Sequence, residues 1–119
     1  KTMIKSYQKK EVVEKERNIA FDVKSQLPEG FIPYDCPLSF EVLFVFPLLS
    51  SMKKAVRQAI EEGEIVYKAT KPDLQDNLMK ILADSMNGIV FVDDSRICKV
   101  ASQKIYGLIP RTEVIIKPL

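Results

Sequence analysis

The stretch LSFEVLFVF at residues 38–46 organises this chain. From Leu38 to Phe46, every second residue is a large apolar one. Side chains of a β-strand point alternately to its two faces, so this pattern predicts a strand with one strongly buried face. We expect this strand to lie in the core of the fold.

Other periodic segments surround that strand and are separated by proline and glycine. A charged segment with helical spacing ends at Leu27-Pro28, and the last strand expected alternates apolar and polar residues up to Lys117. Helices are predicted at residues 1–26, 52–62 and 74–86, and further strands at residues 89–92, 96–106 and 112–117. The predicted fold class is α+β, with a mostly antiparallel sheet of about four strands packed with two main helices plus a short helix. Residues 1–119 are expected to form a single domain.

Composition excludes several kinds of function. Hydrophobic residues make up 46% of the chain and charged residues 29%, which is typical of a soluble globular protein. There is no histidine, so Ser-His-Asp and Cys-His catalysis and the usual zinc sites are excluded. Cys36 and Cys98 lack CxxC spacing, and we expect both to be reduced in a cytoplasmic protein with no membrane segment. The net charge of +2 does not by itself indicate nucleic-acid binding.

Acidic residues gather in two places, KPDLQDNLMK at residues 71–80 and VDDS at residues 92–95. A helix over residues 74–86 is about 18 Å long, and a returning strand up to Asp94 covers about 20 Å. Because the helix and the returning strand are about equally long, Asp93 and Asp94 are predicted to lie beside Asp73 and Asp76. Carboxylates that converge near a lysine are typical of a magnesium site, with Lys80 stabilising charge in the transition state.

Each acidic group also has a purely structural explanation. Asp73 is a good helix N-cap, and Asp76 lies where the carboxylate of a capping box would lie. Asp93 and Asp94 are common turn residues. Capping, however, does not require a second acidic pair at the same end of the helix, which favours the metal site.

Basic residues precede the acidic helix and follow the acidic turn. They are the candidates for contacts with DNA phosphates, although a solvated helix face explains them equally well. The set is Lys53, Lys54, Arg57, Lys68, Lys71 and Arg96.

The motif of residues 71–80, followed by Asn87-Gly88 and by DDSRI at residues 93–97, resembles the RusA-type Holliday junction resolvases. The resemblance covers about residues 71–116 most specifically. It implies that Asp76 and Asp94 bind metal and that Lys80 is the functional lysine. Asp73 matches the other acid of the motif, but two residues separate it from Asp76 where the family has one. The N-terminal strand and basic loop that usually begin the family are not found ahead of the first helix.

The resemblance also implies an activity and partners. The family cuts four-way DNA junctions in recombination and repair, using Mg²⁺, with Mn²⁺ as a substitute. A bacterial or prophage-encoded homodimer that cuts two strands symmetrically is expected, because two-fold symmetry suits two related phosphodiesters. Two alternatives stay open. One is a non-catalytic DNA-binding or protein-interaction module whose acids only cap a helix and shape a turn, and the other is a nuclease for another branched or nicked substrate.

Overall fold

The structure is a computed structural model, and it describes residues 9–119. Helix α1 (Lys9–Gln26) is followed by β1 (Leu38–Phe46), α2 (Lys54–Glu61) and β2 (Val66–Tyr67). A π-helix, η1 (Leu74–Met79), continues directly into α3 (Lys80–Met86), and the short 3-10 helix η2 (Asp94–Arg96) leads into β3 (Ile97–Tyr106) and β4 (Arg111–Pro118). The part of the helix expected at residues 1–8 lies outside the described residues.

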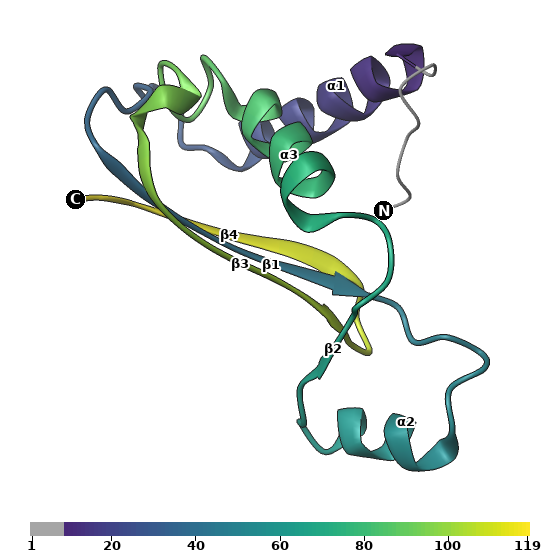
Figure 1. Ribbon diagram of the computed structural model, residues 1–119. Helices are drawn as coiled ribbons and strands as arrows, with labels where there is room; N and C mark the ends of the chain where they lie inside the picture. Colours follow the sequence, from purple (N-terminus) through teal and green to yellow (C-terminus); the bar gives the residue numbers. More distant parts are fainter. Residues whose placement is uncertain (1–8) are drawn as a thin grey trace.

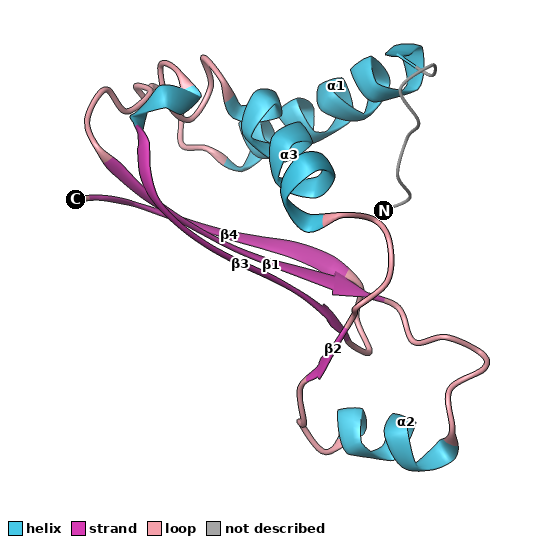
Figure 2. Ribbon diagram, viewed as in Figure 1, coloured by secondary structure: helices cyan, strands magenta, loops and turns pink. Residues whose placement is uncertain are grey.

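The described strands form one sheet in the order β2-β3-β1-β4. β1 pairs in parallel with β3, whereas the β1–β4 and β2–β3 pairs are antiparallel. Helices α1 and α3 cover one face of this sheet (Figures 1 and 2). The α+β class and the mostly antiparallel sheet of four strands are therefore confirmed for the described part of the chain.

The core lies between β1 and the two covering helices. Leu38, Phe40 and Phe44 of β1 are buried, as its alternating pattern predicts, and Leu82 and Met86 of α3 pack against them. Burying such side chains stabilises the fold by about 1.5–3 kcal/mol each. Neither α1, at its described residues, nor any later helix is long and apolar enough to cross a membrane.

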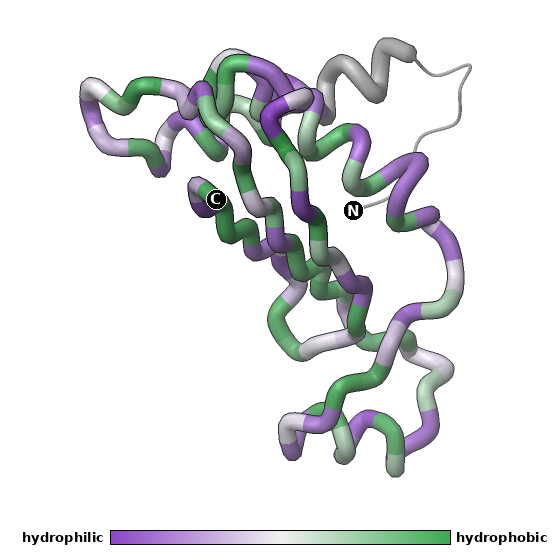
Figure 3. The backbone as a smooth tube through the Cα atoms, turned by 60° about the vertical axis from the view of Figure 1, so that its left-hand side comes forward, coloured by the Kyte–Doolittle hydropathy of each residue, from purple (hydrophilic) through white to green (hydrophobic). Residues whose placement is uncertain are grey.

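Helix α2 lies on an arm, residues 48–65, that projects beyond the end of the sheet (Figure 1). Hydrophobic and hydrophilic residues alternate along this arm (Figure 3), and its Ile60 is buried. The side chain of Arg57 donates hydrogen bonds to the carbonyl oxygens of Leu49 and Met52. This arginine therefore fixes the loop that leads into α2.

The strand predicted at residues 89–92 is wrong. Residues 88–90 form a turn, and Phe91 makes only isolated bridges, to Tyr34 and to Asn87. The amide of Val90 donates to the carbonyl of Met86, so the chain folds back on the end of α3 instead of running along it. Phe91 is completely buried and meets Phe40 edge-to-face, with 6.3 Å between ring centroids. A short apolar run fits a buried turn as well as a strand.

Candidate active site at the start of the acidic helix

The acidic helix begins with an unusual turn. The amide of Leu78 donates to the carbonyl of Asp73 across 3.1 Å, which is the i to i+5 bond of a π-helix. Such a turn holds one residue more than an α-helical turn. The resemblance implies one residue between the two acids, and this chain has two, Leu74 and Gln75, both of which lie in the π-turn. The regular helix begins after it, at Lys80.

The side chains of Asp73 and Asp76 form neither a helix-capping hydrogen bond nor a salt bridge in the described part of the chain. Asp73 is the N-cap residue, yet its side chain makes no capping hydrogen bond. Both carboxylates are exposed, and neither forms a salt bridge with a residue in the range 16–119, where side chains are described. The capping explanation therefore does not hold for Asp73, and both acids are available to a ligand.

Lys80 is exposed one turn further along the helix. It lies close enough to Glu16 of α1 for its charge to act on that carboxyl group. Partial burial raises the pKa of Glu16 and the negative charge of Asp84 raises it further, whereas Lys80 lowers it. Because folding favours the protonated form, the contribution of Glu16 to stability is greatest at acidic pH and falls as the pH rises through its pKa.

Asp93 and Asp94 differ in their interactions: Asp93 caps a short helix, whereas Asp94 forms no ion pair in the described chain. The side chain of Asp93 accepts a hydrogen bond of 3.0 Å from the amide of Ser95 and caps η2. Hydrogen bonding to Ser95 lowers the pKa of Asp93, so this cap weakens only as the pH falls into the acidic range. Asp94 is half-buried and takes no part in the ion pairs of the described chain. The structural explanation thus fits Asp93 and leaves Asp94 available.

The two acidic groups lie at opposite ends of β3. Asp94 begins the short helix η2 that leads into that strand, whereas the ammonium of Lys104, near its other end, donates to the carbonyl oxygens of Thr70 (2.7 Å) and Pro72 (2.8 Å). Asp73 directly follows Pro72. Seven residues of strand separate Ile97 from Lys104, which is about 23 Å. Figure 1 likewise shows the start of α3 and the start of β3 at different ends of the helical layer.

No group of three or more acidic or cysteine side chains within residues 16–119 is placed to hold a metal ion. One chain thus brings Asp73, Asp76 and Lys80 to the start of the acidic helix and Asp94 to a separate place. The metal set of Asp73, Asp76 and Asp94 stays a prediction.

Three of the six basic candidates have contacts within the chain. Arg57 holds the arm as described, and Arg96 forms a 2.7 Å ion pair with Asp35. The ammonium of Lys68 lies over the rings of Phe46 and Tyr106, 5.1 and 5.2 Å from their centroids. The three others, Lys53, Lys54 and Lys71, are exposed and form no salt bridge with any described residue.

Lys104 is a residue that the sequence did not single out as part of the site. Its two hydrogen bonds fix residues 70–72 on β3, and its own carbonyl accepts from the amide of Lys68 at 3.0 Å. It therefore positions the segment that leads into Asp73. Its partners are more than thirty residues away along the chain, so no local pattern indicates this role.

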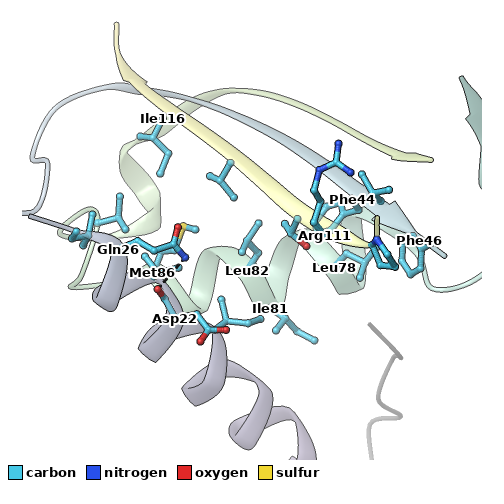
Figure 4. A pocket seen from close by; sticks show the side chains of 18 of the residues that line it. Asp22, Gln26, Phe44, Phe46, Leu78, Ile81, Leu82, Met86, Arg111 and Ile116 are labelled. Carbon is cyan, nitrogen blue, oxygen red and sulfur yellow. Dashed lines mark hydrogen bonds between the residues drawn. The ribbon is translucent and has the colours of Figure 1, made fainter. Parts of the chain in front are cut away.

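A cavity in the described part of the chain lies elsewhere, between α1, α3 and the sheet. It has a volume of about 660 Å³ and is lined mainly by apolar side chains such as Leu82, Met86 and Ile116. Figure 4 shows Asp22 and Gln26 of α1 as polar groups along it. Asp73, Asp76 and Asp94 do not line this cavity, so it is not the place where acidic chemistry is expected.

Comparisons with known proteins agree with the resemblance. The family model of endodeoxyribonuclease RusA matches residues 1–117. The uncharacterized protein YqaN of Bacillus subtilis (strain 168) is 29% identical over 99 residues, which cover 83% of this chain and 68% of that protein. No solved structure matches the chain. Since the family model spans nearly the whole sequence, the chain belongs to the RusA endodeoxyribonuclease family.

Proposed function

We propose that this protein is a Mg²⁺-dependent endonuclease that resolves four-way DNA junctions by paired, symmetric cleavage. Membership of the RusA family implies a crossover-junction endodeoxyribonuclease that binds branched DNA. The observation that carries the finer proposal is the exposed pair Asp73 and Asp76, which neither caps the helix nor pairs with a cation in the described chain.

The proposed ligands are the carboxylates of Asp73, Asp76 and Asp94. Carboxylate oxygens are what Mg²⁺ prefers, and Mn²⁺ accepts the same ligands, so these side chains fit the ion by chemistry. The bound ion supplies an activated water and neutralises charge on the phosphate. Lys80 places an ammonium beside the same helix turn, where it stabilises negative charge that develops on the phosphate.

In a homodimer, the three proposed ligands could come from two chains, although they lie apart within one chain. Within one chain, about 23 Å of strand β3 separates Ile97, which follows the Asp94 turn, from Lys104, which holds the segment before Asp73. A two-fold axis relates opposite ends of the same element, so it can bring Asp94 of a second copy to Asp73 and Asp76 of the first, and the reverse. We therefore propose two composite sites per dimer, one for each strand that is cut.

The proposed DNA contacts rest on the lysines that form no salt bridge with any described residue. Lys53 and Lys54 lie on the projecting arm, and Lys71 lies two residues before Asp73. Each is expected to meet the phosphate backbone, which gives affinity without sequence preference. Arg57, Lys68 and Arg96 are proposed to support the DNA-binding surface, since each already has contacts within the chain.

Incision of a mobile four-way junction tests this function. We expect paired nicks at symmetry-related positions in Mg²⁺ or Mn²⁺ and none with chelator. Flapped and plain duplexes of the same sequences are the matched substrates, and they are expected to be cut much more slowly. Junction binding without incision in any divalent ion would support the non-catalytic module instead, and faster cutting of the flap would indicate a different branched substrate.

A further inference from the structure

The loop before β1 is bound to the chain on both sides of the acidic turn, residues 93–95. On the side before the turn, Tyr34 makes two backbone hydrogen bonds of 2.9 Å with residues 90–92. On the side after it, the carboxylate of Asp35 accepts a hydrogen bond of 2.7 Å from Nε of Arg96. Tyr34 and Asp35 are neighbours in the chain, so one short piece of this loop fixes both ends of the turn.

Within the turn, the residues beside Asp94 are engaged with one another. The side chain of Asp93 accepts a hydrogen bond from the amide of Ser95, and a terminal nitrogen of the Arg96 guanidinium donates to the Ser95 hydroxyl across 3.0 Å. Asp94 lies between these residues in the chain, and its carboxylate forms no ion pair with any residue in the range 16–119. The turn therefore presents this carboxylate without a cation from that range.

Arg96 is the cation that the Asp94 carboxylate would meet if Asp35 did not hold it. It is the only basic residue within four positions of Asp94 in the sequence. A guanidinium and a divalent ion are both attracted to a carboxylate, so each weakens the binding of the other there. The hydrogen bond to Asp35 joins two charged groups, which is a strong class of hydrogen bond, and it directs the guanidinium to a different carboxylate.

We propose that Asp35 is a positioning residue for metal binding: by holding the guanidinium of Arg96, it keeps the carboxylate of Asp94 free for a divalent cation. The inference rests on the proposed function, because it takes Asp94 as a metal ligand. Asp35 acts through Arg96 and needs no contact with the ion or with DNA. Loss of Asp35 therefore weakens metal binding only in a chain that still contains Arg96.

A double-mutant cycle on Mn²⁺ binding tests this role in the absence of DNA. The dissociation constant is measured for the wild type, Asp35→Asn, Arg96→Gln and the double variant, from the electron paramagnetic resonance signal of free Mn²⁺. Asp35→Asn is expected to bind Mn²⁺ about three- to five-fold more weakly, because the released guanidinium then competes with the strength of an exposed ion pair. The double variant is expected to regain the wild-type affinity, since it lacks the competing cation.

Arg96→Gln alone is the matched control. Because Asp35 already directs the guanidinium away from Asp94, this variant is expected to bind Mn²⁺ within about two-fold of the wild type, which is the usual error of additivity between independent sites. An equal gain in affinity from Arg96→Gln with and without Asp35 overturns the proposal, because the two charges then act independently. A double variant that binds as weakly as Asp35→Asn also overturns it, because Asp35 then acts on the ion without Arg96.

The same titration separates this role from the proposed function. If Asp94→Asn loses Mn²⁺ binding but Asp35→Asn keeps the wild-type affinity, the metal site stands and the role of Asp35 falls. If Asp94→Asn binds Mn²⁺ like the wild type, or if the wild type binds none, Asp94 is not a ligand and the inference falls with that assignment. If the cycle shows the expected coupling but the protein cuts no branched DNA in Mg²⁺, the role of Asp35 stands and the proposed function falls.

Discussion

Replacing Asp76 or Asp94 by asparagine is expected to lower the rate of junction cleavage at least about 100-fold, the loss caused by removing one preorganised electrostatic group. Asparagine keeps the size of the side chain but removes the negative charge that a divalent cation requires. Junction binding is expected to persist, because it depends on lysines and because the change removes a charge that repels phosphate. Single-turnover cleavage in Mg²⁺ and gel-shift binding with chelator measure the two properties separately.

Asp93→Asn is the matched control for Asp94→Asn. Asparagine also caps helices, so it preserves the hydrogen bond to Ser95 that Asp93 makes. We expect this variant to cut junctions at close to the wild-type rate. Wild-type cleavage by both Asp76→Asn and Asp94→Asn would contradict the assignment of these acids, and inactivity of Asp93→Asn alone would move the role of Asp94 to its neighbour.

Phe91→Ala is expected to lower the free energy of unfolding by about 3–5 kcal/mol, the usual cost of removing a buried phenylalanine side chain. Phe91 is completely buried, packs edge-to-face on Phe40 and lies in the turn that follows α3. Its truncation leaves a cavity at the point where β1 meets this turn. Urea unfolding measures the loss as a lower midpoint with an unchanged slope.

The neighbouring residue provides the control for this prediction. Val92 is 43% exposed, so Val92→Ala is expected to change the free energy of unfolding by about 0.5 kcal/mol or less. A loss below about 1 kcal/mol for Phe91→Ala would contradict the structure at this turn, because it falls outside the range for a filled core position.

The fold could be predicted wherever one face of an element is buried. β1 was recognisable because its alternating pattern reports its buried face directly, and β4 alternates in the same way. The structure of residues 89–92 could not be predicted, because a run of four apolar residues is compatible with both a strand and a buried turn. What holds Phe91 in place is a bridge to Tyr34, and no periodicity near either residue indicates that pairing.

The candidate site shows a similar division. The types of its residues and their spacing along the chain indicated acidic chemistry beside a lysine. The distance between the two acidic groups depended on a returning strand, and the structure has a turn there. The π-turn and the hold of Lys104 on residues 70–72 are arrangements of backbone hydrogen bonds and remote contacts, which residue types alone do not specify.

Mixed dimers test most directly whether two chains share each site. An Asp76→Asn chain and an Asp94→Asn chain, carrying different affinity tags, are co-expressed, and the doubly tagged dimer is purified. If each site is built from two chains, one site of this dimer contains both substitutions and the other is wild type. We therefore expect nicking at about half the wild-type rate, while each parent homodimer is inactive. A mixed dimer as inactive as its parents, beside a fully active doubly tagged wild-type dimer, would contradict the shared site.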